Sequence, residues 1–226
     1  MKSVIVAIDG PAGAGKSSVA KAVAARLSLA LVDTGAIYRC VALAAQRAGI
    51  GWTDDDALAK LLPSLQVGFG FEGVDNRVLL GGEDVSLAIR TPQMSKGAST
   101  VSARPVVRAG LLELQRRLAR AAPGGAVLEG RDIGTVVFPD AEVKLFITAS
   151  DEVRARRRHA ELSARGLSVP FEQVLADLRA RDRQDSTRAV APLKPAADAQ
   201  VLDTSALGLD EVIERVVRRV EAARSR

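Results

Sequence analysis

A glycine-rich loop that ends in a lysine and a serine follows directly after the apolar run at residues 4–8. Its residues are Gly10, Pro11, Ala12, Gly13, Ala14, Gly15, Lys16 and Ser17, in the spacing G-x-x-x-x-G-K-[ST] of a nucleotide phosphate loop. Glycines lack the Cβ atoms that would hold backbone N–H groups away from a phosphate chain, and Lys16 adds a mobile positive charge. Ser17 can offer its hydroxyl to Mg²⁺, a hard cation that prefers oxygen ligands. We expect this loop, extended by Ser18, to bind the phosphates of ATP or GTP.

Three further polar clusters follow predicted strands or lie on a helix after them, which is where open α/β sheets form their ligand crevices. The clusters are residues 33–39, residues 129–132, and Arg181 with Asp185 and Arg188. The i, i+4, i+7 spacing of the last cluster places its members on one helix face. Arg181 and Asp185 alone would equally suit an ordinary surface ion pair. Two charged residues at the end of a buried strand, as at Arg131 and Asp132, favour a functional site.

The elements that must carry these residues alternate along the chain as short apolar runs and amphipathic stretches. The apolar runs predict strands at 4–8, 30–32, 126–128, 142–147 and 200–202. The amphipathic stretches predict helices at 16–27, 36–48, 105–121, 151–164, 171–183 and 209–223. Ser150 is a suitable N-cap, and Gly49, Gly124 and Gly166 are suitable helix ends. This alternation predicts an α/β fold whose parallel sheet is covered by helices on both faces.

The stretch 65–85 breaks this rhythm. Apolar residues alternate there with period two at Leu65, Val67, Phe69 and Phe71. Gly81-Gly82 is a hairpin-type dipeptide between short apolar runs. The sequence therefore predicts a small antiparallel insert in this region.

The composition is that of an ordinary globular protein, since 47% of the 226 residues are hydrophobic and 26% are charged. No apolar stretch approaches the length of a membrane span and no leader precedes the first strand, so we expect a cytoplasmic protein without a membrane partner. Cys40 and His159 are single, which argues against a disulfide, a cysteine-based zinc site and Ser-His-Asp chemistry. A net charge of +5 and a pI near 9.8 predict an anionic partner, and the 3% of aromatic residues favour small phosphorylated molecules over nucleic acid.

Several stretches of the chain together resemble the bacterial type of cytidylate kinase (CMP/dCMP kinase). They read GPAGAGKSS, LVDTGAIYR, GEDVS, EGRDIGTVVFPDA and RDRQDSTRAVAPLKPAADA, and they extend from Ile8 to about Thr204. The last two stretches are far more specific to this family than the phosphate loop is. The resemblance implies a three-layer nucleoside monophosphate kinase fold, in which a five-stranded parallel sheet is flanked by helices. It implies one domain over 1–226, with its core at 1–62, 101–150 and 190–226, a monophosphate-binding region with the β insert at about 63–100, and a short mobile lid at about 151–170.

The resemblance also implies how the chain would hold the phosphate of CMP or dCMP. Arg39 and Arg131 would bind this acceptor phosphate, with Thr34 beside them. Arg188 would lie at the junction between the acceptor and donor phosphates. Planar guanidinium groups suit this task because they bind phosphate oxygens pairwise.

The base and the sugar of CMP have their own implied contacts at the matching positions. Ser99, Arg108 and Asp132 would read the cytosine, and Arg181 and Asp185 would hold the sugar hydroxyls. The chemistry agrees, because a carboxylate such as Asp132 accepts from the exocyclic amine of cytosine and Arg108 can donate to its carbonyl oxygen.

An arginine-rich stretch lies within the implied lid, at Arg154, residues 156–158 and Arg165. It can be interpreted as a solvated helix face or as a lid that closes over phosphates. Arg154, Arg158 and Arg165 share one helical face and are the lid candidates, and we expect Arg154 and Arg158 to contact ATP.

The expected reaction needs no general base, because the acceptor is a phosphate oxygen that is already ionised at neutral pH. It needs positive charge around the transferred group, which we assign to Lys16, Arg131 and Arg188 with Mg²⁺. Asp33 and Asp132 are both candidates for supporting the metal through water. Closure of the lid and of the region 65–85 would exclude water as a competing acceptor.

Two other functions remain open at this point. The chain could be a kinase of another monophosphate, such as UMP, AMP or dTMP, which would share the phosphate loop and the arginines. More remotely, it could be a basic nucleic-acid-binding protein that uses a nucleotide as a switch. For the preferred function we expect a monomer that acts on ATP, CMP and dCMP and binds no nucleic acid.

Overall fold

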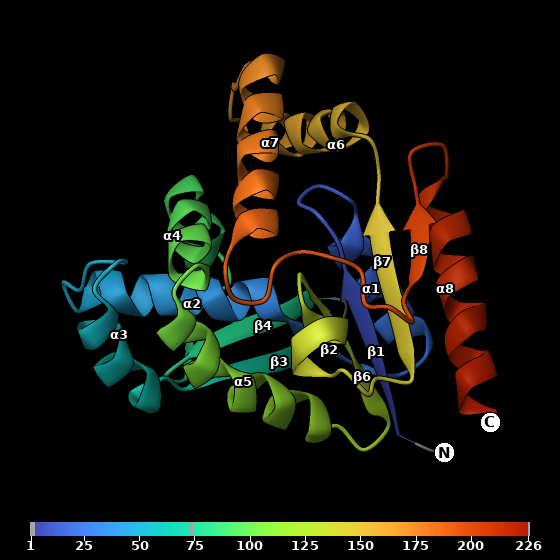
Figure 1. Ribbon diagram of the computed structural model, residues 1–226, viewed down its shortest axis with the longest axis horizontal. Helices are drawn as coiled ribbons and strands as arrows, with labels where there is room; N and C mark the ends of the chain where they lie inside the picture. Colours follow the sequence, from blue (N-terminus) through green and yellow to red (C-terminus); the bar gives the residue numbers. More distant parts are fainter. Residues whose placement is uncertain (1–2, 73–74, 226) are drawn as a thin grey trace. The chain divides into compact units, whose positions relative to one another are not determined.

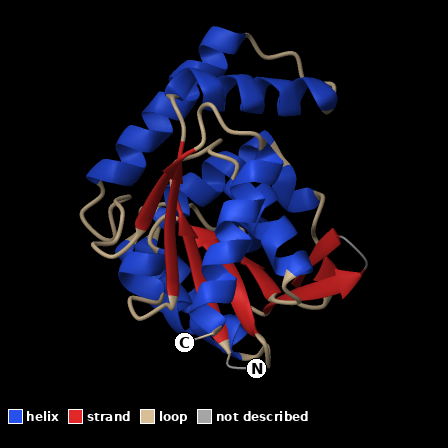
Figure 2. Cartoon of the chain, turned by 90° about the vertical axis from the view of Figure 1, so that its right-hand side faces the viewer, coloured by secondary structure: helices blue, strands red, loops and turns tan. Residues whose placement is uncertain are grey.

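The computed structural model describes residues 3–72 and 75–225. Its larger sheet has five strands in the order β2-β6-β1-β7-β8 and is flanked by helices (Figures 1 and 2). The strands are β1 (Val4–Asp9), β2 (Ala30–Asp33), β6 (Gly125–Gly130), β7 (Val143–Thr148) and β8 (Gln200–Asp203). β6 and β7 pair with β1 in parallel, and β8 pairs with β7 in parallel. The predicted strand positions and the α/β fold class are confirmed.

Contacts divide the chain into two compact units, of which the first comprises residues 1–30 and 123–226. Helices α1 (Lys16–Arg26) and α8 (Leu209–Arg224) pack on each other and on the sheet of this unit. Its core includes the fully buried side chains of Ile8, Val23, Leu128 and Ile147. A π-helical turn, η3 (Ile133–Val137), follows β6.

Helices α6 (Asp151–Ala164) and α7 (Phe171–Thr187) pack against each other in the same unit. The N-cap prediction is confirmed, because the hydroxyl of Ser150 accepts a hydrogen bond from the Val153 N–H at 3.4 Å. Their apolar seam is made by Ala155, Leu162, Val174, Leu175 and Leu178, and Ala12 of the glycine-rich loop belongs to it. The loop is therefore packed directly against this helix pair.

The second unit comprises residues 31–122. Its helices are α2 (Thr34–Arg47), α3 (Asp55–Leu61), α4 (Pro92–Ser102) and α5 (Pro105–Arg120), with the short 3-10 turns η1 (Leu62–Ser64) and η2 (Ala88–Arg90). α2 and α4 approach closely, since a Cβ on Gly97 would lie 2.8 Å from the Cβ of Ala42 and 2.7 Å from the ring of Trp52. The ring nitrogen of Trp52 donates to the carbonyl of Ala42 at 3.0 Å, which fastens the contact.

The antiparallel insert is confirmed as a three-stranded sheet of β3 (Val67–Glu72), β4 (Asp75–Leu80) and β5 (Glu83–Asp84). Gly81 and Gly82 join β4 to β5 with φ of 59° and 86°, and two consecutive positive φ values require residues of this kind. Residues 73–74 of the predicted insert lie outside the described residues.

Some elements differ from their sequence prediction. α3 and α4 were not predicted, because α3 is short and α4 is rich in polar and β-branched residues with Gly97 in its middle. α7 continues to Thr187, beyond the predicted end at 183, and Arg188 follows it in an extended conformation. None of the described helices has both the length and the apolar character that crossing a membrane demands.

Candidate active site

The glycine-rich loop joins the end of β1 to the start of α1. Gly10 has φ +148°, and a Cβ at this position would lie 1.9 Å from the carbonyl oxygen of Ile147 on β7. Only glycine fits here, because neither the conformation nor the space admits a side chain. Lys16, Ser17 and Ser18 then form the first turn of α1, in which Lys16 is buried and both serines are exposed.

Lys16 is buried, and its ammonium group donates to the carbonyl of Pro11 at 2.7 Å. Burial, together with the positive charge of Arg131, lowers the pKa of Lys16 from its ordinary 10.5 to about 7. The negative charges of Glu129 and Asp9 raise the pKa of Lys16 and so oppose part of this shift. Arg181 of α7 also lowers this pKa, so the lysine lies among charged groups from three segments of the chain: the end of β1, residues 129–131 and α7.

Ser17 donates its hydroxyl hydrogen bond to the carboxylate of Glu129 at 2.8 Å. Glu129 is buried near the end of β6, which the parallel register places beside Ile8 of β1. A hydroxyl and a carboxylate at this separation match the oxygen ligands that Mg²⁺ prefers. Only Asp33 and Asp132 were expected from the sequence to support the metal. Glu129 was part of the polar cluster 129–132, but its role was missed.

Asp9 is a second missed residue. Its carboxylate oxygens accept hydrogen bonds from the backbone N–H groups of Ile133 and Gly134, each at 2.8 Å. Burial raises the pKa of Asp9 to about 6, although both backbone hydrogen bonds oppose this shift. Asp9 thus fixes the π-helical turn that follows Arg131 and the buried Asp132. Its signal in the sequence was an acid placed directly between an apolar strand and the phosphate loop.

A cluster of arginines surrounds Asp185 in the same unit. The Arg131 Nε donates to the Asp185 carboxylate at 2.8 Å, and an Arg188 nitrogen lies 3.6 Å from its other oxygen. Burial alone raises the pKa of Asp185, but the charges of Arg131, Arg181 and Arg188 outweigh it and hold the pKa below its ordinary value. Residues predicted from separate motifs are therefore brought together around one ionised carboxylate.

The remaining predicted contacts lie in the unit 31–122, where the structure shows their local partners. Arg39 donates to the carbonyl of Ile89 at 2.9 Å and to the hydroxyl of Ser95 at 2.8 Å. The two other predicted polar groups are Thr34, which is buried in the first turn of α2, and Ser99, which is half-buried on α4.

Arg108, on α5, is also buried in this unit. Its guanidinium lies over the ring of Tyr38, 5.6 Å from the centroid, and donates to the carbonyl of Ser102 at 3.2 Å. The stacking and the hydrogen bond hold the guanidinium in a defined orientation.

The arginines of α6 differ in their surroundings. Arg154 is buried, with ion pairs to Asp151 at 2.5 Å and to Asp182 at 2.6 Å. Arg158 is more exposed and pairs with Glu161 at 2.8 Å. The prediction that Arg154 and Arg158 contact ATP remains a prediction.

Comparison with known proteins gives consistent matches. The family model described as cytidylate kinase matches residues 6–222. A protein named cytidylate kinase from Geobacter sp. (strain M21) is 55% identical over 218 residues, which cover 96% of this chain and 93% of that protein. A protein of the same name from Geobacter sulfurreducens is 51% identical and covers 98% of this chain and 96% of its own length.

A solved structure supports the fold alone. The crystal structure of an uncharacterized protein from Eubacterium ventriosum has a TM-score of 0.53 to this chain at 13% identity, and the match covers 97% of this chain and 99% of that one.

Proposed function

The chain belongs to the cytidylate kinase family, and we propose that it transfers the γ-phosphoryl group of ATP to the phosphate of CMP or dCMP in a direct in-line step. The products are ADP and CDP or dCDP. The acceptor oxygen is ionised at neutral pH, so the reaction requires positioning and positive charge and no residue that removes a proton.

On the donor side, we assign the phosphates of ATP to the loop 10–15, with Lys16 and the hydroxyls of Ser17 and Ser18. Mg²⁺ would be held by Ser17 and supported by Glu129, whose oxygens are already 2.8 Å apart. The metal supplies positive charge next to the phosphates when it is bound. Arg158, with Arg154, is assigned to the same nucleotide from α6.

On the acceptor side, we assign the phosphate of CMP to Arg131, Arg188 and Arg39, with Thr34 beside them. The observation that carries this proposal is the group of Arg131, Arg181 and Arg188 around Asp185, which we call the Asp185 cluster. Arg131 is in direct contact with Asp185, and its charge also lowers the pKa of Lys16. Cations of the acceptor group and of the phosphate loop thus influence each other, and we assign both to the same transferred phosphoryl group.

Base recognition is assigned to Ser99, Arg108 and Asp132, and sugar recognition to Arg181 and Asp185. Cytosine offers an amine to a carboxylate and a carbonyl to an arginine, whereas uracil carries a carbonyl where cytosine carries the amine. We therefore expect discrimination against UMP. We further propose that the enzyme acts as a monomer on free nucleotides.

A panel of nucleoside monophosphates tests this function. Purified protein with ATP and Mg²⁺ is given CMP, dCMP, UMP, AMP or dTMP, and ADP release is followed. CMP and dCMP should have the highest kcat/KM, and ATP hydrolysis without an acceptor should be slow. A preference for UMP or AMP, or hydrolysis that CMP does not accelerate, would contradict the proposal.

Arg131→Ala provides the matched test of the site. It should lower kcat/KM for CMP by about 10³-fold or more, in line with arginines that stabilise phosphoryl transfer, while ATP affinity changes little. Arg219→Ala on the exposed face of α8 is the control and should stay within about twofold of wild type. Equal losses of ATP binding and turnover in Arg131→Ala would point to a folding role instead.

A further inference from the structure

Two arginines of α6 bind carbonyl groups of the phosphate loop. Arg154 donates to the carbonyl of Ala12 at 2.9 Å, and Arg157 donates to the carbonyl of Ala14 at 3.3 Å. Arg157 is in turn held by Thr204, through its hydroxyl at 3.1 Å and its carbonyl at 2.9 Å. Alternate peptide groups of the loop are thus fixed from α6.

These hydrogen bonds determine the direction of the loop N–H groups. A peptide bond is planar and trans, so the Ala12 carbonyl and the Gly13 N–H point in opposite directions. A carbonyl held toward α6 therefore turns the Gly13 N–H toward the other side of the loop. The same argument applies to the Ala14 carbonyl and the Gly15 N–H. The arginines orient donors of the kind that a phosphate loop offers to its ligand.

The loop also lies in close contact with the helix backbone at the same point. A Cβ on Gly13 would be 3.1 Å from the Arg154 carbonyl oxygen and 3.2 Å from the Arg154 Cβ. The side chain of Ala12 is buried in the apolar seam of α6 and α7. The carbonyl contact is therefore part of a packed junction.

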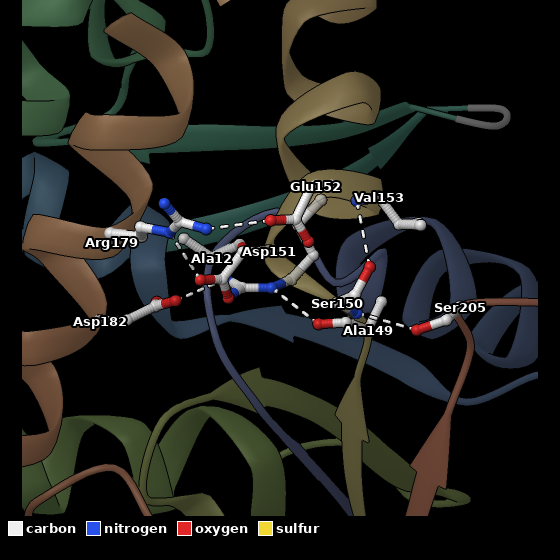
Figure 3. A network of polar contacts seen from close by, with 10 residues as sticks. Ala12, Ala149, Ser150, Asp151, Glu152, Val153, Arg179, Asp182 and Ser205 are labelled. Atoms are coloured by element: carbon white, nitrogen blue, oxygen red, sulfur yellow. Dashed lines mark hydrogen bonds and ion pairs between the residues drawn. The ribbon is translucent and has the colours of Figure 1, made fainter. Parts of the chain in front are cut away.

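Arg154 is itself held by three acceptors besides Ala12. Figure 3 labels all four partners. Arg154 donates to the carbonyl of Ala149 at 3.0 Å and forms ion pairs with Asp151 and Asp182. The nitrogen that binds Asp182, at 2.6 Å, is the same Nη1 that binds Ala12. Asp151 is exposed enough to bind Arg179 as well, whereas Asp182 has a side-chain exposure of only 19%.

We propose that Asp182 is a positioning residue for ATP binding, which holds the Arg154 guanidinium on the Ala12 carbonyl and so keeps the Gly13 N–H directed toward the phosphates. No proposed substrate contact includes Asp182. It acts through Arg154, and it joins the phosphate loop to α7, the helix of Arg181 and Asp185. This inference rests on the proposed use of ATP and extends it to a residue of α7.

Asp182→Asn tests the proposal because it keeps the shape of the side chain and removes its charge. ATP affinity, measured by calorimetry without any monophosphate, should fall by about tenfold, as expected when a largely buried ion pair loses one of its charges. Asp182→Glu should lie closer to wild type. Asp177→Asn is the control, because Asp177 is exposed on the same helix and, within the described part of the chain, accepts a local hydrogen bond from Gln173 at 2.7 Å. It should stay within twofold of wild type.

The opposite outcome is equally informative. If Arg154 serves mainly as a ligand of ATP, the loss of Asp182 releases it and ATP binds as well or more tightly. Unchanged or tighter binding in Asp182→Asn would overturn the proposal. CMP phosphorylation by the wild-type protein is a separate measurement, so failure of the proposed function is distinguished from failure of this inference.

A second variant covers the case in which Asp182→Asn does not fold. Arg154→Lys keeps the charge but replaces Nε and Nη1, which bind Ala149 and Ala12 separately, by a single ammonium nitrogen. It should weaken ATP binding by about as much as Asp182→Asn, and the double variant should be no weaker than Arg154→Lys alone. Additive losses would show that the two residues act independently, which contradicts the proposal.

Discussion

The low pKa of Lys16 predicts that ATP binding takes up a proton. In the ATP-free enzyme the pKa is about 7, because Lys16 is buried beside the positive charge of Arg131. The phosphates of ATP should restore it toward its ordinary 10.5, since opposite charge favours the charged form. At pH 8.5 about one proton should then enter with each ATP, and at pH 7.5 about three-quarters of a proton.

The sign of the pH effect on affinity follows from this uptake. Binding that takes up a proton becomes weaker as pH rises, so ATP affinity should fall by about eightfold between pH 7.5 and 8.5. Calorimetry in two buffers with different ionisation enthalpies measures the number of protons directly. Uptake of less than about 0.2 proton at pH 8.5 would refute the reasoning.

Two variants separate Lys16 from other titrating groups. Lys16→Arg stays charged at every pH of the experiment, so it should bind ATP without this uptake even if its affinity is lower. Arg131→Gln removes the second-largest cause of the low pKa and should reduce the uptake at pH 7.5. If Lys16→Arg takes up the same number of protons as wild type, another group is responsible.

Three further predictions concern single positions. Burial, assisted by the charge of Asp33, raises the pKa of Cys40 to about 12. A thiol reagent at pH 8 should therefore modify Cys40 only when the protein unfolds, and rapid modification of the native protein would contradict this. Gly10→Ala should cost ~3 kcal/mol of unfolding free energy or prevent folding, whereas Gly51→Ala, which meets nothing within 4 Å, should be neutral by chemical denaturation. Glu129→Gln should raise the Mg²⁺ concentration for half-maximal activity by about tenfold, and an unchanged requirement would remove Glu129 from the metal site.

Much of the fold was predictable because each core strand is a short apolar run between polar segments. β1, β7 and β8 begin and end within a residue or two of their predicted bounds. β1 and β7 are buried along almost their whole length, which leaves a continuous hydrophobic signal, whereas in β8 only Leu202 is buried. The insert was visible from its period-two alternation and from Gly81-Gly82. α4 was not, because Gly97 of this helix packs against Ala42 of α2 and against Trp52, and no local pattern in the sequence reports these contacts.

The candidate site, like the fold, could be predicted from the sequence only in part. The loop 10–17 is local in sequence, so its glycines, Lys16 and Ser17 could be identified without a structure. Glu129 becomes a partner of Ser17 only because β6 pairs with β1 in parallel across more than a hundred residues. The buried position of Arg154 depends on acceptors from the phosphate loop and α7, so an arginine-rich sequence could be read only as a solvated or lid helix.

The Asp185 cluster indicates why so many arginines can be assembled before a substrate arrives. Like charges repel strongly where burial lowers the dielectric constant, and an ionised carboxylate among Arg131, Arg181 and Arg188 offsets that repulsion. One carboxylate against three guanidinium groups leaves two positive charges in excess, which matches the charge of a monophosphate near neutral pH. An incoming phosphate would compete with Asp185 for Arg131 and Arg188. The carboxylate therefore both holds the arginines in place and sets how strongly they attract their anion.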